Sequence, residues 1–587
     1  MFTDTQLDTQ LAALQARTPG QDVRFVSAAD FKTRFFARAH AAAAVIPKAT
    51  KKKPHERRSW MGILQKDLGA VDCSCVPSLA KKAFASGSDV LESISMSRAI
   101  SADAPEPFMD LDRLGTLPAD FNTEEFRVVG ERPFVAVARN PLSTFGADVD
   151  TAGYTAARRM IMEENSLPPP EAVRIDEFLN YFRYAYGAPA DGQDLAPHFE
   201  CAAAPWNPAH RLLLVGIQAR EIAKDNLPPA HYVFLIDNSG SMCDVMAMVK
   251  EALTILIDQL RPQDKVSLVT YGGEVSTLME GGQDKAALRA AVEKLDAGGF
   301  TPGAEAIQRA YALARAHFIR GGNNRIVLVT DGDFNVGASS EAALASMVEK
   351  ERGQGIYLSV IGAGCGNYKD NRMKMLANKG DGNYIYIDTP DEARRAFTQG
   401  IAGQMFTIAH DAKFQIEFNP ARVHAYRLLG YELRDLQDSE FRDDTKDAGE
   451  IGVGQQVTAL YELVMSDAPA AVKAAALPDT PPLRYSSVTA IGSDELLTCR
   501  LRYLPPKGGE AVEQEHIVTD ATEGANIAWA ATVAEFALLL RDSKYKGDAT
   551  YESLLRHAKA TLNPATDDDR LGFIVMATRA AKIAKRK

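Results

Sequence analysis

The fold is decided by the stretch HYVFLIDNSGSM, which covers residues 231–242. It starts as an apolar run rich in β-branched and aromatic residues, which predicts a buried strand. It ends in Asp237-Asn238-Ser239-Gly240-Ser241, a turn-forming sequence rich in hydroxyl groups. From Met242 to Leu260, apolar residues then recur every three or four positions, which predicts a helix with one face against a sheet. The stretch is therefore read as a strand, a polar turn and a helix in succession.

Similar apolar runs follow along the chain and alternate with helical patterns, one of them marked by Ile307, Tyr311, Ala314 and Phe318. Near-continuous apolar strands between helices are typical of a sheet covered on both faces. We therefore predict an α/β domain over residues 229–404, with a central doubly wound, mainly parallel sheet. Ligands of such sheets bind at the carboxyl ends of the strands. The further runs are KVSLVTY (265–271), RIVLVTD (325–331), IYLSVIG (356–362) and NYIYID (383–388).

The sequence on either side of this domain shows a different pattern of strand and helix signals. Strand patterns separated by Gly, Pro and Asp clusters follow it, and the strand pattern near 211–222 is a candidate for the same sheet. Helical patterns return near the C-terminus. The predicted flanking regions are 1–135, poorly structured or loosely helical; 136–228, an ordered segment with a strand and two helices; 405–522, β-rich and sandwich-like; and 523–587, helical.

Length and composition exclude several classes of protein. The chain has 587 residues, which at roughly 150 per domain is enough for about four domains. With 46% apolar and 24% charged residues it resembles an ordinary globular protein, and its net charge of -11 gives no global field for nucleic acid or an anionic membrane. The six cysteines are scattered, and neither a leader peptide nor a long apolar run is visible. We expect a cytoplasmic protein with no membrane span and no nucleic-acid partner.

Hydroxyl and carboxyl side chains gather at the predicted strand ends. Asp237, Ser239 and Ser241 follow the first strand, and Gly240 between them is expected to let the backbone turn tightly. Thr301 ends the loop sequence Gly-Gly-Phe-Thr, and Asp331 ends the strand RIVLVTD. Oxygen ligands without Cys or His favour Mg²⁺, with Mn²⁺ and Ca²⁺ as alternatives, over zinc. The sequence therefore predicts a divalent cation site at one rim of the sheet.

The pattern Asp237-x-Ser239-x-Ser241 with Thr301 and Asp331 resembles the metal-ion-dependent adhesion site of the von Willebrand factor type A (VWA) family, at all five motif positions. The flanking segments NPLSTFGADVDTA, DDTKDAGEIG, VTALYEL and RDSKYKGDATYE are similar to a bacterial YfbK-like type. In that type a VWA domain lies between an N-terminal signature segment and a C-terminal domain of unknown function. Its members commonly carry an export or lipoprotein leader, which this sequence does not show.

The resemblance implies a binding function. Ser239 and Ser241 would bind the metal directly, whereas Thr301, Asp237 and Asp331 would bind it directly or through water. With few anionic ligands the ion keeps an open position for an Asp or Glu carboxylate of a partner protein. The family resemblance also suggests an AAA+ ATPase as partner. We therefore expect a scaffold or adaptor protein rather than an enzyme.

Two other interpretations of the same residues remain open. The hydroxyl-rich turn after Asp237 could serve only as a helix cap. Asp331-Gly332-Asp333 also resembles the strand-end motif of metal-dependent phosphatases, in which Asp331 would be the nucleophile and Asp333 the acid/base. No phosphate-binding P-loop, zinc-protease HExxH motif or hydrolase GxSxG elbow is present, and the dispersed histidines suggest no role.

Overall fold

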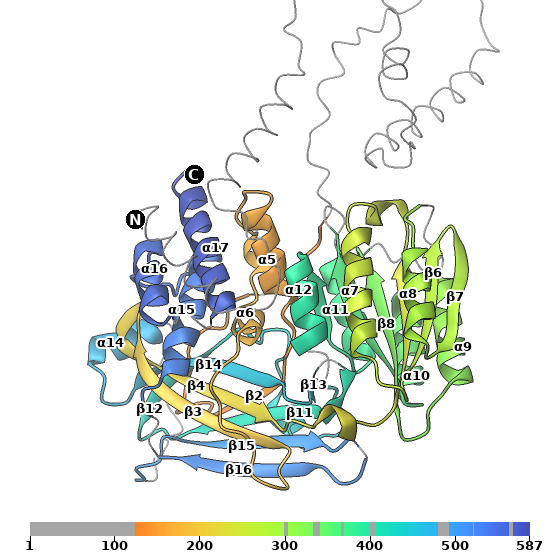
Figure 1. The fold of residues 1–587 in the computed structure, drawn as a ribbon. Coiled ribbons are helices and arrows are strands. Elements are labelled where there is room, and N and C mark those ends of the chain that lie inside the picture. Colours follow the sequence, from red (N-terminus) through yellow and green to blue (C-terminus); the bar gives the residue numbers. More distant parts are fainter. Residues whose placement is uncertain are drawn as a thin grey trace, which may run out of the picture. The chain divides into compact units, whose positions relative to one another are not determined.

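The computed structural model describes most of the chain from residue 124 onward (Figure 1). The prediction for the N-terminal region falls almost wholly outside the described residues, as do Thr301 and Asp333. The described ranges are 124–128, 130–298, 303–332, 341–364, 369–399, 403, 405–478, 492–506, 508–519, 522–562 and 567–586.

The central domain is built on a sheet with the strand order β10-β9-β8-β5-β6-β7. All neighbouring strands are parallel except β7, which runs antiparallel to β6 at the edge. The apolar runs predicted as strands are confirmed. The sequence analysis missed β7, whose residues are exposed or half-buried and form no apolar run. The strands are β5 (Ala230–Asp237), β6 (Lys265–Gly272), β7 (Glu274–Gly282), β8 (Asn323–Thr330), β9 (Ile356–Ala363) and β10 (Tyr384–Ile387).

Helices cover both faces of this sheet, so the predicted doubly wound α/β fold is confirmed. One face packs on α7 (Met246–Gln259), α8 (Lys285–Glu293) and α12 (Pro390–Arg394). The other packs on α9 (Gly303–Ala316), α10 (Glu341–Arg352) and α11 (Asp370–Lys379). The stripe predicted after the first strand is buried at Val249, Leu253 and Leu256 of α7.

The flanks of the central domain combine into one β-sandwich. One antiparallel sheet has the order β1-β12-β14-β4-β3, and the other has the order β13-β11-β15-β16 with β2 also on β11. Strand β4, from before the central domain, pairs with β14, from after it, and β2 pairs with β11 in the same way. The central domain is therefore inserted between two halves of the sandwich. The strands are β1 (Val135–Ala136), β2 (Leu142–Gly146), β3 (Leu195–Ala204), β4 (Asn207–Ala219), β11 (Thr407–Phe418), β12 (Val423–Leu429), β13 (Gly449–Gly452), β14 (Gln456–Met465), β15 (Leu497–Leu504) and β16 (Val512–Val518).

Helices from both ends of the described chain cover the first sheet of the sandwich (Figure 1). These are α5 (Ala152–Met162) and α6 (Ile175–Tyr181) together with α15 (Ala525–Leu540), α16 (Tyr551–Ala560) and α17 (Asp568–Ala584). Aromatic rings pack between these helices. The ring centroids of Phe182, which directly follows α6, and Trp529 lie 5.1 Å apart, and those of Phe536 and Phe573 lie 5.2 Å apart. None of the described helices has both the length and the apolar composition that a membrane span requires.

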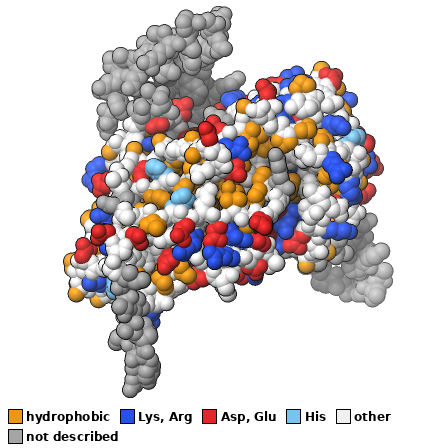
Figure 2. Space-filling model, turned by 90° about the horizontal axis from the view of Figure 1, so that it is seen from below, with side chains coloured by type: hydrophobic (Ala, Val, Ile, Leu, Met, Phe, Trp, Pro, Cys, Tyr) orange, Lys and Arg blue, Asp and Glu red, His pale blue; other side chains and the backbone are white. Residues whose placement is uncertain are grey.

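The outer face of the second sheet carries charges of both signs. Figure 2 shows the molecule from the side on which β15 and β16 lie, and basic and acidic side chains are interspersed there. Arg500 pairs with Glu515 at 2.9 Å, and Arg502 pairs with Asp444 at 2.9 Å. Such exposed pairs add little stability each and keep the sheet face polar.

A buried network of charges joins α11 of the central domain to the flanking segments. The Lys374 ammonium lies 3.0 Å from Asp148, 3.2 Å from Asp150 and 2.5 Å from Glu177. Arg174 reaches Asp370 on α11 at 2.7 Å, and Arg434 reaches Asp148 at 3.0 Å. We call this network the α11 ion cluster; its members are Asp148, Asp150, Arg174, Asp176, Glu177, Asp370, Lys374 and Arg434.

Candidate metal site

The candidate site lies at the rim where β5 and β8 end side by side. These strands are parallel neighbours, with Ile236 opposite Val329. Asp237 is the last residue of β5, and Asp331 directly follows Thr330, the last residue of β8. Parallel pairing therefore brings two carboxylates that are far apart in sequence to one edge of the sheet, as the sequence predicted.

The loop after β5 places its hydroxyl groups in front of Asp237. The Ser239 backbone N–H donates to Asp237 Oδ1 at 2.9 Å, and a short 3₁₀ turn, Gly240–Met242, follows. Ser239 Oγ and Ser241 Oγ lie 3.0 Å apart. Asp237 is fully buried and Ser239 nearly so, whereas Ser241 is exposed. The carboxylate thus forms the floor of the site and the hydroxyls its opening.

Thr330 is a member of the rim to which the sequence analysis assigned no role. Its Oγ1 donates to Asp237 Oδ2 at 3.2 Å and accepts from the Gly332 N–H at 3.1 Å. The sequence pattern that could have indicated this role is the position of Thr330 directly before Asp331 at the end of β8. A hydroxyl at that position lies beside the carboxyl end of the neighbouring strand β5. Thr330 orients Asp237 while fixing the loop that carries Asp331.

The electrostatics of the rim favour a cation. Burial raises the pKa of Asp237 to about 6; hydrogen bonds from Ser239 and Thr330 oppose this rise, and the Asp331 carboxylate adds to it. Within the described chain, Asp237 forms no ion pair with a basic side chain. A carboxylate that is buried beside another carboxylate is stabilised by any cation that binds between them.

Close backbone contacts hold the first loop in place. A Cβ on Gly272, the last residue of β6, would lie 2.5 Å from the carbonyl carbon and oxygen of Asn238. The Asn238 carbonyl also accepts from the Gly298 N–H at 2.6 Å. The expectation for Gly240 is wrong, because this residue is not among those with positive φ and a Cβ there would meet open space. Of these two glycines, Gly272 is the one at which a side chain would clash with the loop.

The structure thus brings together Asp237, Ser239 and Ser241 and places Asp331 at the neighbouring strand end. Thr301, the fifth candidate ligand, lies outside the described residues, so its position stays a prediction. The phosphatase interpretation depends on Asp333, which also lies outside them. The oxygen donors that are described suit a hard cation such as Mg²⁺.

Comparisons with known proteins agree with this arrangement. The family model described as "von Willebrand factor type A domain" matches residues 232–399, and one described as "von Willebrand factor" matches residues 120–214. A third, "Uncharacterized protein YfbK, C-terminal", matches residues 403–583. The model boundaries place the rim within the type A domain. Such domains are protein-interaction modules.

The chain is also similar to individual proteins over differing shares of its length. A protein of Escherichia coli (strain K12) named "Uncharacterized protein YfbK" is 37% identical over 474 residues, which are 78% of this chain and 81% of the relative. A human protein, inter-alpha-trypsin inhibitor heavy chain H3, is 26% identical over 34% of this chain and 24% of its own length. A solved structure, von Willebrand factor type A from Catenulispora acidiphila, is 17% identical over 65% of this chain and 88% of that chain, with a TM-score of 0.36.

Proposed function

The chain belongs to the YfbK family of VWA-domain proteins, and on this premise we propose that it binds partner proteins through a divalent cation held at the rim. Asp237, Ser239, Ser241, Thr301 and Asp331 would hold the ion, with Mg²⁺ as the best fit. An Asp or Glu of the partner would complete the coordination. The protein would act as a scaffold or adaptor rather than as an enzyme.

One observation carries this proposal: a buried carboxylate faces two serine hydroxyls 3.0 Å apart, and the described chain supplies no basic side chain to it. Hydroxyl ligands are neutral, so an ion held by them keeps much of its positive charge. A carboxylate from outside is then a favourable ligand, since charge-assisted contacts are stronger than neutral ones. The exposure of Ser241 supports the proposal, because an ion bound there would be accessible to a partner.

The test is capture of partners from a cell lysate on the immobilised full-length protein, in Mg²⁺ and in EDTA. We expect proteins that the wild type retains only with Mg²⁺ and that Ser239→Ala/Ser241→Ala does not retain. Calorimetric titration with Mg²⁺ should show saturable binding to the wild type that the double variant loses. An AAA+ ATPase among the retained proteins would agree with the partner that the family resemblance suggests.

The matched control is Cys243→Ser, which changes an exposed side chain beside the motif without removing a candidate ligand. It should retain the same partners as the wild type. If the wild type and the double variant bind the same set of proteins with and without metal, metal-bridged recognition at the rim is wrong.

A further inference from the structure

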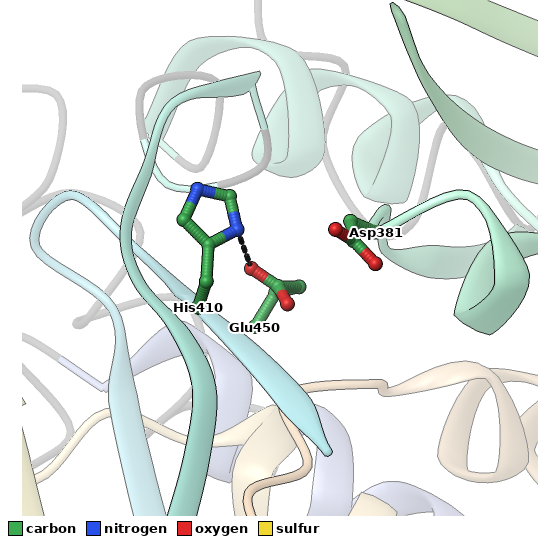
Figure 3. Close-up of side chains that lie close together, drawn as sticks. All are labelled: Asp381, His410 and Glu450. Carbon is green, nitrogen blue, oxygen red and sulfur yellow. Dashed lines mark ion pairs between the residues drawn. The ribbon is translucent and has the colours of Figure 1, made fainter. Parts of the chain in front are cut away.

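A second group of metal-ligand side chains lies where the VWA domain meets the sandwich. Asp381 stands in the turn between α11 and β10 of the VWA domain, whereas His410 is on β11 and Glu450 on β13 of the sandwich (Figure 3). One imidazole nitrogen and one oxygen from each carboxylate lie within 4.8 Å of one another. We call this group the junction triad. It shares no residue with the rim.

Irregular backbone aims these side chains toward one another. The pairing of β11 with β13 shifts register between Ala409 and Ala412, on either side of His410. Asp411 in this bulge has a φ of 49°, and Asp381 has a φ of 45°, both in the left-handed region that Asp tolerates better than most residues. Bulges re-aim side chains and are frequent beside functional sites. The geometry of the junction triad is thus set by two unusual stretches of backbone.

Glu450 is buried and forms no ion pair with a described lysine or arginine. Its Oε2 lies 2.5 Å from His410 Nδ1, yet this oxygen receives no hydrogen bond of normal geometry from the described residues. Arg352 lies nearby but directs the same Nη1 to Asp381 at 2.6 Å and to Asp447 at 3.0 Å. Among the described residues, the ionic contact of Glu450 is therefore with His410 alone.

The pKa values of the group reflect an excess of negative charge. Burial, and then repulsion from Glu450, raise the pKa of Asp381 to about 7. Burial lowers the pKa of His410, but the Glu450 carboxylate more than offsets this, so that the pKa is raised. The part of each shift that comes from Glu450 reflects its negative charge, which also attracts a cation.

The α11 ion cluster shows what an occupied arrangement of this kind looks like. Three buried carboxylates, from Asp148, Asp150 and Glu177, also lie within 4.8 Å of one another there. The Lys374 ammonium occupies the position between them. No described lysine or arginine forms an ion pair with Glu450, although Arg352 pairs with Asp381 and the buried Arg325 interacts electrostatically with both carboxylates.

We propose that Asp381, His410 and Glu450 bind a divalent cation of the zinc class that bridges the VWA domain and the sandwich. An imidazole nitrogen with two carboxylate oxygens is a donor set that suits Zn²⁺, and water would complete a tetrahedral shell. Zinc–ligand bonds are about 2.0–2.2 Å long. Side-chain movement alone can bring the three ligand atoms to this distance from one ion, because they already lie within 4.8 Å of one another. Because the ligands come from both domains, the ion would fix the orientation of the VWA domain on the sandwich.

The test uses the full-length chain carrying Ser239→Ala/Ser241→Ala, stripped of metal with EDTA and titrated with Zn²⁺ in excess Mg²⁺. We expect one tightly bound Zn²⁺ per chain by metal analysis after gel filtration, and a higher melting temperature with Zn²⁺ than without. His410→Ala, Glu450→Gln or Asp381→Asn on this background should weaken Zn²⁺ binding at least about 100-fold. Bound Co²⁺ should give visible absorption that Glu450→Gln abolishes.

Two controls separate this site from other zinc ligands. His424→Ala, on β12, should leave the bound zinc unchanged. So should Cys73→Ser/Cys75→Ser, which removes the only closely spaced pair of cysteines in the sequence. Glu450→Gln keeps the size of the side chain, and its circular dichroism without metal shows whether the fold is intact. If the parent retains no zinc, or if His410→Ala and Glu450→Gln retain as much as the parent, the proposal is overturned. Either result leaves the Mg²⁺ proposal for the rim untouched, because that proposal is tested with intact serines.

Discussion

The rim and the α11 ion cluster both gather buried carboxylates in the VWA domain or at its border, but they neutralise them in different ways. In the α11 ion cluster, Lys374 lies within 3.2 Å of Asp148, Asp150 and Glu177. At the rim, Asp237 receives hydrogen bonds from the Ser239 N–H and the Thr330 hydroxyl, and none of the described basic residues pairs with it. The described part of the chain supplies a cation to the α11 ion cluster and none to Asp237.

This difference separates a structural ion cluster, which holds two domains together, from a site that can bind an ion from solution. A buried carboxylate with an internal cation is locked, because removing either partner leaves an uncompensated charge. A buried carboxylate with only neutral donors keeps a demand for positive charge that an ion from solution can meet. The α11 ion cluster is therefore suited to hold the VWA domain in place, and the rim is suited to exchange ligands.

The largest effect is expected when the internal cation is removed. Lys374→Met should lower the free energy of unfolding by about 3–5 kcal/mol, because three buried carboxylates lose their shared counter-charge. Urea denaturation followed by circular dichroism measures this change.

The control for this prediction lies on the same helix. Lys379 pairs with Glu349 at 2.6 Å, but both side chains are more than a third exposed. Lys379→Met should change the free energy of unfolding by no more than about 1 kcal/mol. Equal effects of the two variants would show that the α11 ion cluster does not lock the domains as described.

A smaller effect is expected when the first loop of the rim is displaced without removal of a ligand. Gly272→Ala places a Cβ 2.5 Å from the Asn238 backbone, so the loop that carries Ser239 and Ser241 must shift. We expect a loss of about 1–3 kcal/mol in the free energy of unfolding and a Mg²⁺ affinity reduced about tenfold. Thermal denaturation and calorimetric Mg²⁺ titration check the two parts.

Gly240→Ala tests whether crowding, rather than loss of a glycine, causes this effect. Its Cβ would meet no atom within 4 Å, although Gly240 lies between the two serines. This variant should bind Mg²⁺ as the wild type does. A larger loss of affinity in Gly240→Ala than in Gly272→Ala would contradict the description of the loop.

The sequence predicted the strands of the VWA domain because each is a buried apolar run. It predicted that Asp237, Ser239 and Ser241 lie together because they follow one of those runs directly. It could not predict the pairing of β4 with β14, since the whole central domain separates them and pairing leaves no local pattern. The charged members of the α11 ion cluster were missed for a similar reason. Lys374 taken alone reads as a solvated helix residue, and only the tertiary fold buries it among carboxylates.

The last effect concerns the pH dependence of stability at the α11 ion cluster. Burial, together with repulsion from Asp148, raises the pKa of Asp176 to about 7, so the folded state holds a proton that the unfolded state has lost above about pH 4. Folding stability then falls as pH rises from about 4 to about 7. Asp176→Asn cannot titrate, so its free energy of unfolding should rise relative to that of the wild type between pH 4.5 and 7, by up to about 1.4 kcal/mol per pH unit.

Urea denaturation of both proteins across this pH range measures the difference. Asp391→Asn is the control, because the Asp391 side chain is 93% exposed and removing its charge should leave the pH dependence as it is in the wild type. An Asp176→Asn curve that runs parallel to the wild-type curve would mean that Asp176 is already ionised in the folded state near pH 5. The positive charges of Lys374, Arg174 and Arg434 would then neutralise one more carboxylate than the described contacts account for, and the α11 ion cluster would be a stronger joint than its distances indicate.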